Sequence, residues 1–171
     1  MNDEIAVLDA ESASAAIDEL ADILTDCVEG GASVNFMLPF SHGDAVAFFR
    51  KVIAWVERGD TVLIVARDGG RAVGTVQLGI DTPPNQPHRA DVKKMLVHRS
   101  ARKRGLGAAL MTRVEAEAKA RGRTLLVLDT ASDDAERLYE RSGWQRCGVI
   151  PDYAMWPAGG FCDSTFFWKK L

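Results

Sequence analysis

The sequence predicts an α/β fold built on one mixed, largely antiparallel sheet of about six to seven strands, flanked by about four helices. Two observations support it. Two β-rich runs at residues 61–67 and 72–80 are joined by an Asp-Gly-Gly-Arg turn, which indicates an antiparallel hairpin. A helical pattern at residues 105–121 separates the strand candidate 88–97 from the apolar run 125–128, as the crossover of a β-α-β unit requires.

The first half of the chain predicts a strand, two helices and three antiparallel strands. Residues 5–8 form a short strand candidate, and apolar residues then recur at helical spacing over residues 17–28 until a Gly-Gly pair ends the helix. A second helix begins near residues 41–44 and stops at Gly59. The hairpin follows it, and residues 88–97 pair as a third strand after a proline-rich break.

The second half predicts helix, strand, helix and two strands. The helix over residues 105–121 ends where Gly122 can cap it, and residues 125–128 form a continuous apolar run, typical of a strand covered on both faces. Another helix begins near residue 133 and ends at Gly143. Strands are expected at residues 144–150 and 164–169, with a loop between them.

Length and composition indicate a single globular domain over residues 1–171. No apolar run reaches the roughly 18 residues of a membrane span, and the acidic N-terminal segment does not resemble a signal peptide, so we expect a cytoplasmic protein without a membrane partner. The net charge of −3 argues against nucleic acid as a partner. The three cysteines and three histidines are not in metal-ligand spacing, so no metal is expected.

A basic, glycine-containing segment, Arg102-Lys103-Arg104-Gly105-Leu106-Gly107, opens the helix of the β-α-β unit. Glycines let a backbone approach a ligand closely, and a helix start presents unpaired N–H groups to an anion. Six Lys and Arg residues and no acid fall within residues 93–104. The segment therefore predicts a site for a diphosphate; the alternative is a basic, solvated turn.

Two common phosphate motifs do not fit. A P-loop needs Lys and then Ser or Thr after its last glycine, but Gly107 is followed by Ala108. A dinucleotide fingerprint places its glycines directly after the strand, but seven residues separate Val97 from Gly105, and Leu110 occupies the place of the third glycine.

Two motifs resemble the GNAT N-acetyltransferase family: the Arg-x-x-Gly-x-Gly loop and the later segment Ala135-x-x-Leu138-Tyr139-Glu140-x-x-Gly143-Trp144. The order of the predicted elements is also that of the family's fold, so the resemblance covers nearly the whole chain. It implies an enzyme that uses acetyl-CoA as cosubstrate and no metal, and a homodimer is common in the family. Ser132 stands where the family often has Asn.

A narrower resemblance is to the tabtoxin-resistance acetyltransferase group. The segments that resemble this group are Gly30-Gly31-Ala32-Ser33-Val34-x-Phe36-Met37 and Leu128-Asp129-Thr130. The resemblance implies a small-molecule amine acceptor, such as the amino group of a toxin or an antibiotic.

The resemblance also implies a set of cosubstrate-binding residues. Main-chain groups of Met95, Leu96 and Val97 are expected to hold the pantetheine arm. The diphosphate is expected to lie on the loop residues Arg102, Lys103, Arg104, Gly105, Leu106, Gly107 and Ala108. Ser132 either contacts the CoA arm or only caps the following helix.

Tyr139 and Asp129 are the predicted catalytic residues. The family tyrosine at the Tyr139 position directs its hydroxyl to the CoA sulfur and can protonate the leaving thiolate; the alternative is an aromatic core residue. Asp129 would orient the amine or take its proton; the alternative is a turn carboxylate that accepts backbone N–H bonds.

The acceptor pocket is expected to combine residues after the first long helix with residues of the late loop. They are Ser33, Asn35, Phe36, Tyr153 and Trp156. Two other functions remain open. A peptide N-terminus or a protein lysine would need an open groove, which the bulky 153–156 segment is expected to close. A catalytically silent acyl-CoA sensor would keep the CoA loop but has no need of Tyr139.

Overall fold

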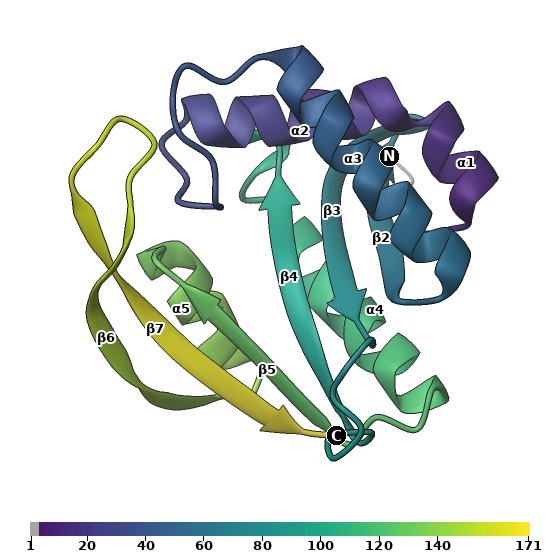
Figure 1. Cartoon of the computed structure of the whole chain (residues 1–171), viewed down its shortest axis with the longest axis vertical. Coiled ribbons are helices and arrows are strands. Elements are labelled where there is room, and N and C mark those ends of the chain that lie inside the picture. Colours follow the sequence, from purple (N-terminus) through teal and green to yellow (C-terminus); the bar gives the residue numbers. More distant parts are fainter. Residues whose placement is uncertain (1–3) are drawn as a thin grey trace.

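The computed structural model describes residues 4–171 as one seven-stranded sheet with helices on both faces (Figure 1). The strands, in the spatial order β1-β2-β3-β4-β5-β7-β6, are β1 Glu4–Leu8, β2 Thr61–Asp68, β3 Arg71–Gly79, β4 Arg89–Val97, β5 Leu125–Thr130, β6 Gln145–Met155 and β7 Phe161–Lys170. The helices are α1 Ala10–Ala15, α2 Ile17–Glu29, α3 His42–Arg58, α4 Leu106–Ala120 and α5 Asp133–Arg141, with a 3₁₀ turn at Arg99–Ala101.

The predicted fold class is confirmed. Within the described sheet β4 and β5 form the single parallel pair, and α4 is the crossover between them. The helix count differs from the prediction of about four, which assigned no element to residues 10–15. Asp9 caps a separate short helix, α1, by accepting the Ser12 backbone N–H at 2.8 Å, and the non-helical conformation of Ala16 divides it from α2.

Two apolar cores lie on opposite faces of the sheet. One core fills the space between the sheet and α4, where Leu106, Leu110 and Val114 are buried. The other lies beneath α1, α2 and α3, with Leu24 and Phe49 fully buried. Because central strands are covered on both faces, most of β2 and β3 is buried.

β4 and β5 pair over only part of their length. Their ladder runs from Arg89 opposite Leu125 to Asp91 opposite Val127, whereas β4 continues to Val97. Figure 1 shows the two strands diverging from this point. The divergence leaves main-chain groups of β4 without a neighbouring strand on the β5 side, inside the sheet rather than at its edge.

The last two strands are longer than predicted. β6 continues beyond residue 150 through Pro151, with a register shift between Ile150 and Ala154, so Tyr153 lies in a strand rather than in the expected loop. Proline is tolerated there because β6 is an edge strand. Within residues 4–171, no helix is both long and apolar enough to cross a membrane.

Candidate active site

The amino end of α4 is a helix start without a side-chain cap. Gly105 is the N-cap residue with φ +85°, a left-handed conformation that suits glycine, and the first turn contains no acidic residue. The backbone N–H groups of Leu106, Gly107 and Ala108 belong to the first helical turn, which has no intrahelical acceptors. This end of α4 therefore offers N–H donors and the positive end of a helix dipole to an anion.

Two arginines of the same loop hold the loop in place. The Arg102 guanidinium turns inward, with Nε donating to the Val97 carbonyl at 3.0 Å and Nη2 lying 3.7 Å from Cys27 Sγ. Arg104 Nη1 pairs with Asp68 at 2.8 Å. The contribution predicted for Arg102 to diphosphate binding would therefore come from its main chain and its charge.

Gly107 lies where α4 closely approaches α5 and β4. A Cβ atom at this position would be 3.1 Å from Leu138 Cδ2 of α5 and 3.8 Å from Met95 Sδ of β4. The Gly107 position thus joins the predicted diphosphate loop, the α5 motif and the predicted pantetheine strand in one place.

The divergence of β4 and β5 holds a pocket of about 230 Å³. Its wall residues are Asp91, Val92 and Lys93 from β4, Val127, Leu128 and Asp129 from β5, and Phe166 from β7. Asp129 Oδ2 accepts a hydrogen bond from Ser164 Oγ at 2.7 Å. The partner is a β7 side chain and not a turn N–H, so the geometry does not support the alternative of a turn carboxylate.

Tyr139 is a residue of α5 and is buried in the core between the sheet and α4. It is 5% exposed and packs against Trp144 and Phe167 at ring-centroid distances of 6.0 and 5.7 Å. Its hydroxyl has no hydrogen-bond partner among residues 4–171. Burial, assisted by the Asp129 carboxylate, raises the pKa of Tyr139, so this phenol is protonated at neutral pH and is a weaker acid than a free tyrosine.

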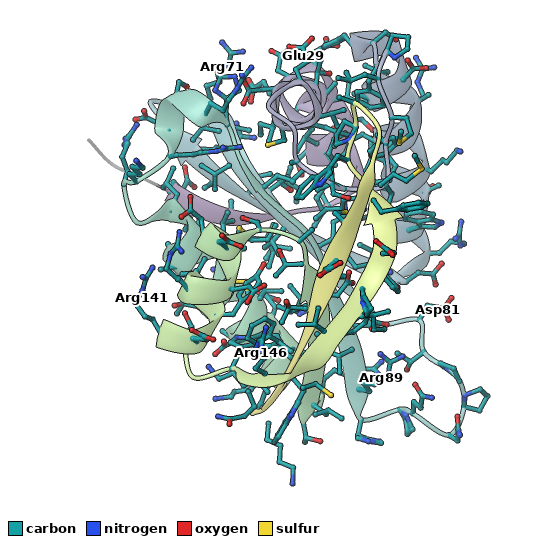
Figure 2. All side chains as sticks on the ribbon, turned by 90° about the vertical axis from the view of Figure 1, so that its left-hand side faces the viewer. Glu29, Arg71, Asp81, Arg89, Arg141 and Arg146 are labelled. Carbon is teal, nitrogen blue, oxygen red and sulfur yellow. The ribbon has the colours of Figure 1, made fainter. Side chains whose placement is uncertain are left out.

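The α2–α3 loop and the tip of the β6–β7 hairpin meet above the divergence, and both Figure 1 and Figure 2 place them side by side. Ser33 Oγ donates to the Met155 carbonyl at 2.9 Å, and the Leu38 N–H donates to the Pro157 carbonyl at 2.9 Å. Ser33 therefore fastens the two segments to each other, a role that the sequence did not suggest.

The other predicted acceptor residues are spread over two spaces. Asn35 and Phe36 line an outer pocket of about 450 Å³ against α3. Tyr153 packs edge-on against Phe166 at 5.3 Å and so reaches the wall of the inner pocket. Trp156 lies in the hairpin turn and is 39% exposed.

Ser132 has a demonstrable structural role. Its side chain accepts the Ala135 N–H at 3.3 Å and caps α5, as the alternative reading proposed. Among the predicted pantetheine residues, Met95 packs toward α4, Leu96 is buried beneath α2, and the Val97 carbonyl already accepts from Arg102. In residues 4–171, no group of three or more His, Cys, Asp or Glu side chains is arranged to hold a metal ion.

The sequence analysis missed Lys94. It was read as part of the basic run, but its ammonium lies 6.0 Å from the centre of the Phe36 ring, and its charge interacts with that of Asp129. Burial lowers the pKa of Lys94 to about 8. This side chain belongs to the predicted acceptor side of the molecule and not to the diphosphate loop.

Comparisons with known proteins agree with this geometry. Residues 18–144 match the model of the acetyltransferase (GNAT) family. An "IAA acetyltransferase" of Azospirillum brasilense is 34% identical over 107 residues, which are 61% of this chain and 68% of that protein.

Solved structures share the fold at low identity. A phosphinothricin acetyltransferase from Sinorhizobium meliloti in complex with acetyl-CoA has a TM-score of 0.80 at 18% identity, over 100% of this chain and 89% of that chain. A ribosomal-protein-alanine N-acetyltransferase from Brucella melitensis has a TM-score of 0.78 at 22% identity, over 98% and 99%. The narrower resemblance to the tabtoxin-resistance group stays a prediction.

Proposed function

This chain belongs to the acetyltransferase (GNAT) family, and we propose that it transfers the acetyl group of acetyl-CoA to the primary amine of a small molecule by direct attack in a ternary complex. Acetyl transfer from acetyl-CoA follows from the family. The proposal adds the chemical class of the acceptor, and the observation that supports it is the contact between the α2–α3 loop and the hairpin tip.

The residues present fit acetyl-CoA as cosubstrate. The uncapped start of α4 offers donors to a diphosphate, and the first turn carries no acid that would repel it. The β4 edge that faces the divergence can hydrogen-bond the amides of an extended pantetheine arm through main-chain groups of Met95, Leu96 and Val97. Such an arm would lead from α4 to the pocket that contains Asp129.

Two proton transfers accompany the reaction. The acceptor must lose a proton from its ammonium form before it attacks, and Asp129, which faces the pocket, is the proposed group that attracts and deprotonates it, directly or through water. The leaving thiolate must gain a proton, and Tyr139 is the proposed donor because its hydroxyl is protonated and engaged by no other described group.

A small acceptor is favoured because the hydrogen bonds of Ser33 and Leu38 to the hairpin close the acceptor side with protein. An extended peptide would need an open groove between these two segments. The neighbouring Cys162 Sγ contacts Ser33 Oγ at 3.4 Å and adds to the closure.

Thiol release from acetyl-CoA, measured across small amines, amino acids, aminoglycosides and peptides, tests the proposal. We expect turnover with a small amine, and a large loss in Tyr139→Phe, which keeps the ring contacts with Trp144 and Phe167. Efficient acetylation of peptides without activity on any free amine would refute the small acceptor. Tight acetyl-CoA binding without turnover of any acceptor would indicate an acyl-CoA sensor.

A further inference from the structure

Lys94 reaches the acceptor side because of a bulge in β4. Thr75 pairs with Leu96 and Gln77 pairs with Lys93, so Val76 of β3 faces two β4 residues instead of one. Lys94 itself has φ +51°, a conformation that a residue with a side chain rarely adopts. Backbone strain of this kind is kept where the surrounding structure imposes it, and it concentrates at functional sites.

The bulge changes which face of the sheet the even-numbered residues of β4 point to. Before it, Ala90 and Val92 point into the core beneath α4, whereas after it Leu96 points into the core beneath α2. Without the extra residue, Lys94 would follow Ala90 and Val92 into an apolar core. The bulge instead places its ammonium beside the ring of Phe36, in the loop that borders the acceptor side.

The Lys94 ammonium has three N–H donors and no hydrogen bond or ion pair to any of residues 4–171. The side chain is half-buried. Lys169, also half-buried, shows the usual arrangement, because its ammonium binds both oxygens of Glu115 at 2.8 Å and the Ser142 carbonyl. A partly desolvated cation that has no hydrogen bond to protein favours a ligand that supplies an anion.

An anion is close but is not paired with it. Asp129 interacts electrostatically with Lys94, but no oxygen of Asp129 is within ion-pair distance of the ammonium. Asp129 instead accepts the hydrogen bond from Ser164 of β7. A cation beside Phe36 and a carboxylate in the pocket wall thus lie within electrostatic reach of each other, each with unused hydrogen-bonding capacity.

We infer that Lys94 binds an acidic group of the acceptor while Asp129 receives its amine, so that the acceptor is an amino acid or a similar small molecule carrying both charges. This inference rests on the proposed function and names the acceptor class for it. The Phe36 ring, whose centre lies 6.0 Å from the ammonium, limits where the acidic group can lie. Lys94 is then a specificity residue that contacts the acceptor and has no part in proton transfer.

The test compares amino acids with their carboxamides, which keep the amine and lose the negative charge. The ratio of kcat/KM within each pair is measured in the wild-type protein and in Lys94→Met. Differences in amine reactivity cancel because the same pair is used for both proteins. We expect the preference for the acid to fall about 10- to 100-fold in Lys94→Met, the range for loss of one charge-assisted hydrogen bond. The loss should appear in the KM of the amino acid.

Two further variants complete the design. Lys94→Arg should keep part of the preference, because it retains the charge. Lys119→Met, on the exposed side of α4, removes a positive charge away from the site and should leave the preference unchanged. The KM for acetyl-CoA confirms in each case that the protein is folded.

Three outcomes would count against the reasoning in different ways. An unchanged acid preference in Lys94→Met would overturn the inference alone. An equal loss of kcat for acids and carboxamides would assign Lys94 to proton transfer and would also overturn it. A wild-type protein that acetylates peptides and no small amine would refute the proposed function itself.

Discussion

Replacement of Lys94 by methionine is expected to stabilise the folded protein at pH 7, although it removes a side chain of the proposed acceptor site. Methionine has a similar length and flexibility but no charge to desolvate. Burial lowers the pKa of Lys94 from the usual 10.5 to about 8. At about 1.4 kcal/mol for each tenfold change in proton affinity, carrying the charge costs the folded state about 3 kcal/mol relative to the unfolded chain.

The direction of the pH dependence follows from linkage. Below pH 8 the lysine is charged in both states, and the full destabilisation is present. Between pH 8 and about 10.5 the unfolded chain binds the proton and the folded protein does not, so the stability of the wild-type protein rises with pH relative to the variant. Above that window the two proteins should differ little in stability.

Urea unfolding of both proteins at pH 7 and at pH 10.5 measures the effect, because all other titrating groups are shared. For a chain of 171 residues, about 3 kcal/mol corresponds to a rise in Tm of about 6–12 °C at pH 7. Lys119→Met serves as the control for loss of an exposed charge. A Lys94→Met protein that is no more stable at pH 7, or whose advantage persists unchanged at pH 10.5, would refute the assignment of Lys94 as a desolvated cation.

Four other predictions concern the proposed functions of the site and the surface. Gly107→Glu should weaken acetyl-CoA binding about 100-fold or more in titration calorimetry, because it places a negative charge at the uncapped start of α4. Gly107→Ala adds no charge and has only to displace the end of the Leu138 side chain. Equal affinity in all three proteins would exclude the loop as the diphosphate site. Tyr139→Phe should lower kcat by about 10² to 10⁴ with little change in acetyl-CoA affinity. Full activity of this variant in stopped-flow and steady-state assays would show that another group protonates the thiolate. Asp129→Asn should raise the KM for the amine and lower kcat/KM while acetyl-CoA binding is retained; unchanged amine kinetics would remove Asp129 from the mechanism. The homodimer expected from the family should form through the apolar β6–β7 hairpin, where Phe161 is 67% exposed. Phe161→Ser should therefore shift the protein toward the monomer in sedimentation experiments. A dimer that persists in this variant would use another surface.

Local signals in the sequence were sufficient for most of the fold. Helical spacing, the glycine at the start of α4 and the Ser41 cap with its Asp44 partner each act within a few residues, so the elements and their order could be predicted. The extension of β6 through Pro151 could not, because only pairing with β7 holds that segment in a strand. The separate helix α1 was missed because its six residues are too few for a periodic pattern.

The site was predicted in part for the same reason. The loop before α4 and Asp129 could be singled out because each lies near the end of a predicted strand, and the structure places Asp129 in the pocket between β4 and β5. Lys94 was counted only as part of the basic run, because the bulge that turns it toward Phe36 depends on the register with β3. Ser33 was expected to face a substrate, but its partner is the Met155 carbonyl, which lies 122 residues away in the chain.

The short ladder between β4 and β5 has an evolutionary consequence. On the proposed binding mode, acetyl-CoA is recognised by main-chain groups of β4 and of the α4 start, which every residue except proline supplies. On the same proposal, the acceptor is recognised by side chains such as Asp129 and Lys94. Substitutions there can exchange one acceptor for another without disturbing the use of acetyl-CoA, so the two specificities can change independently.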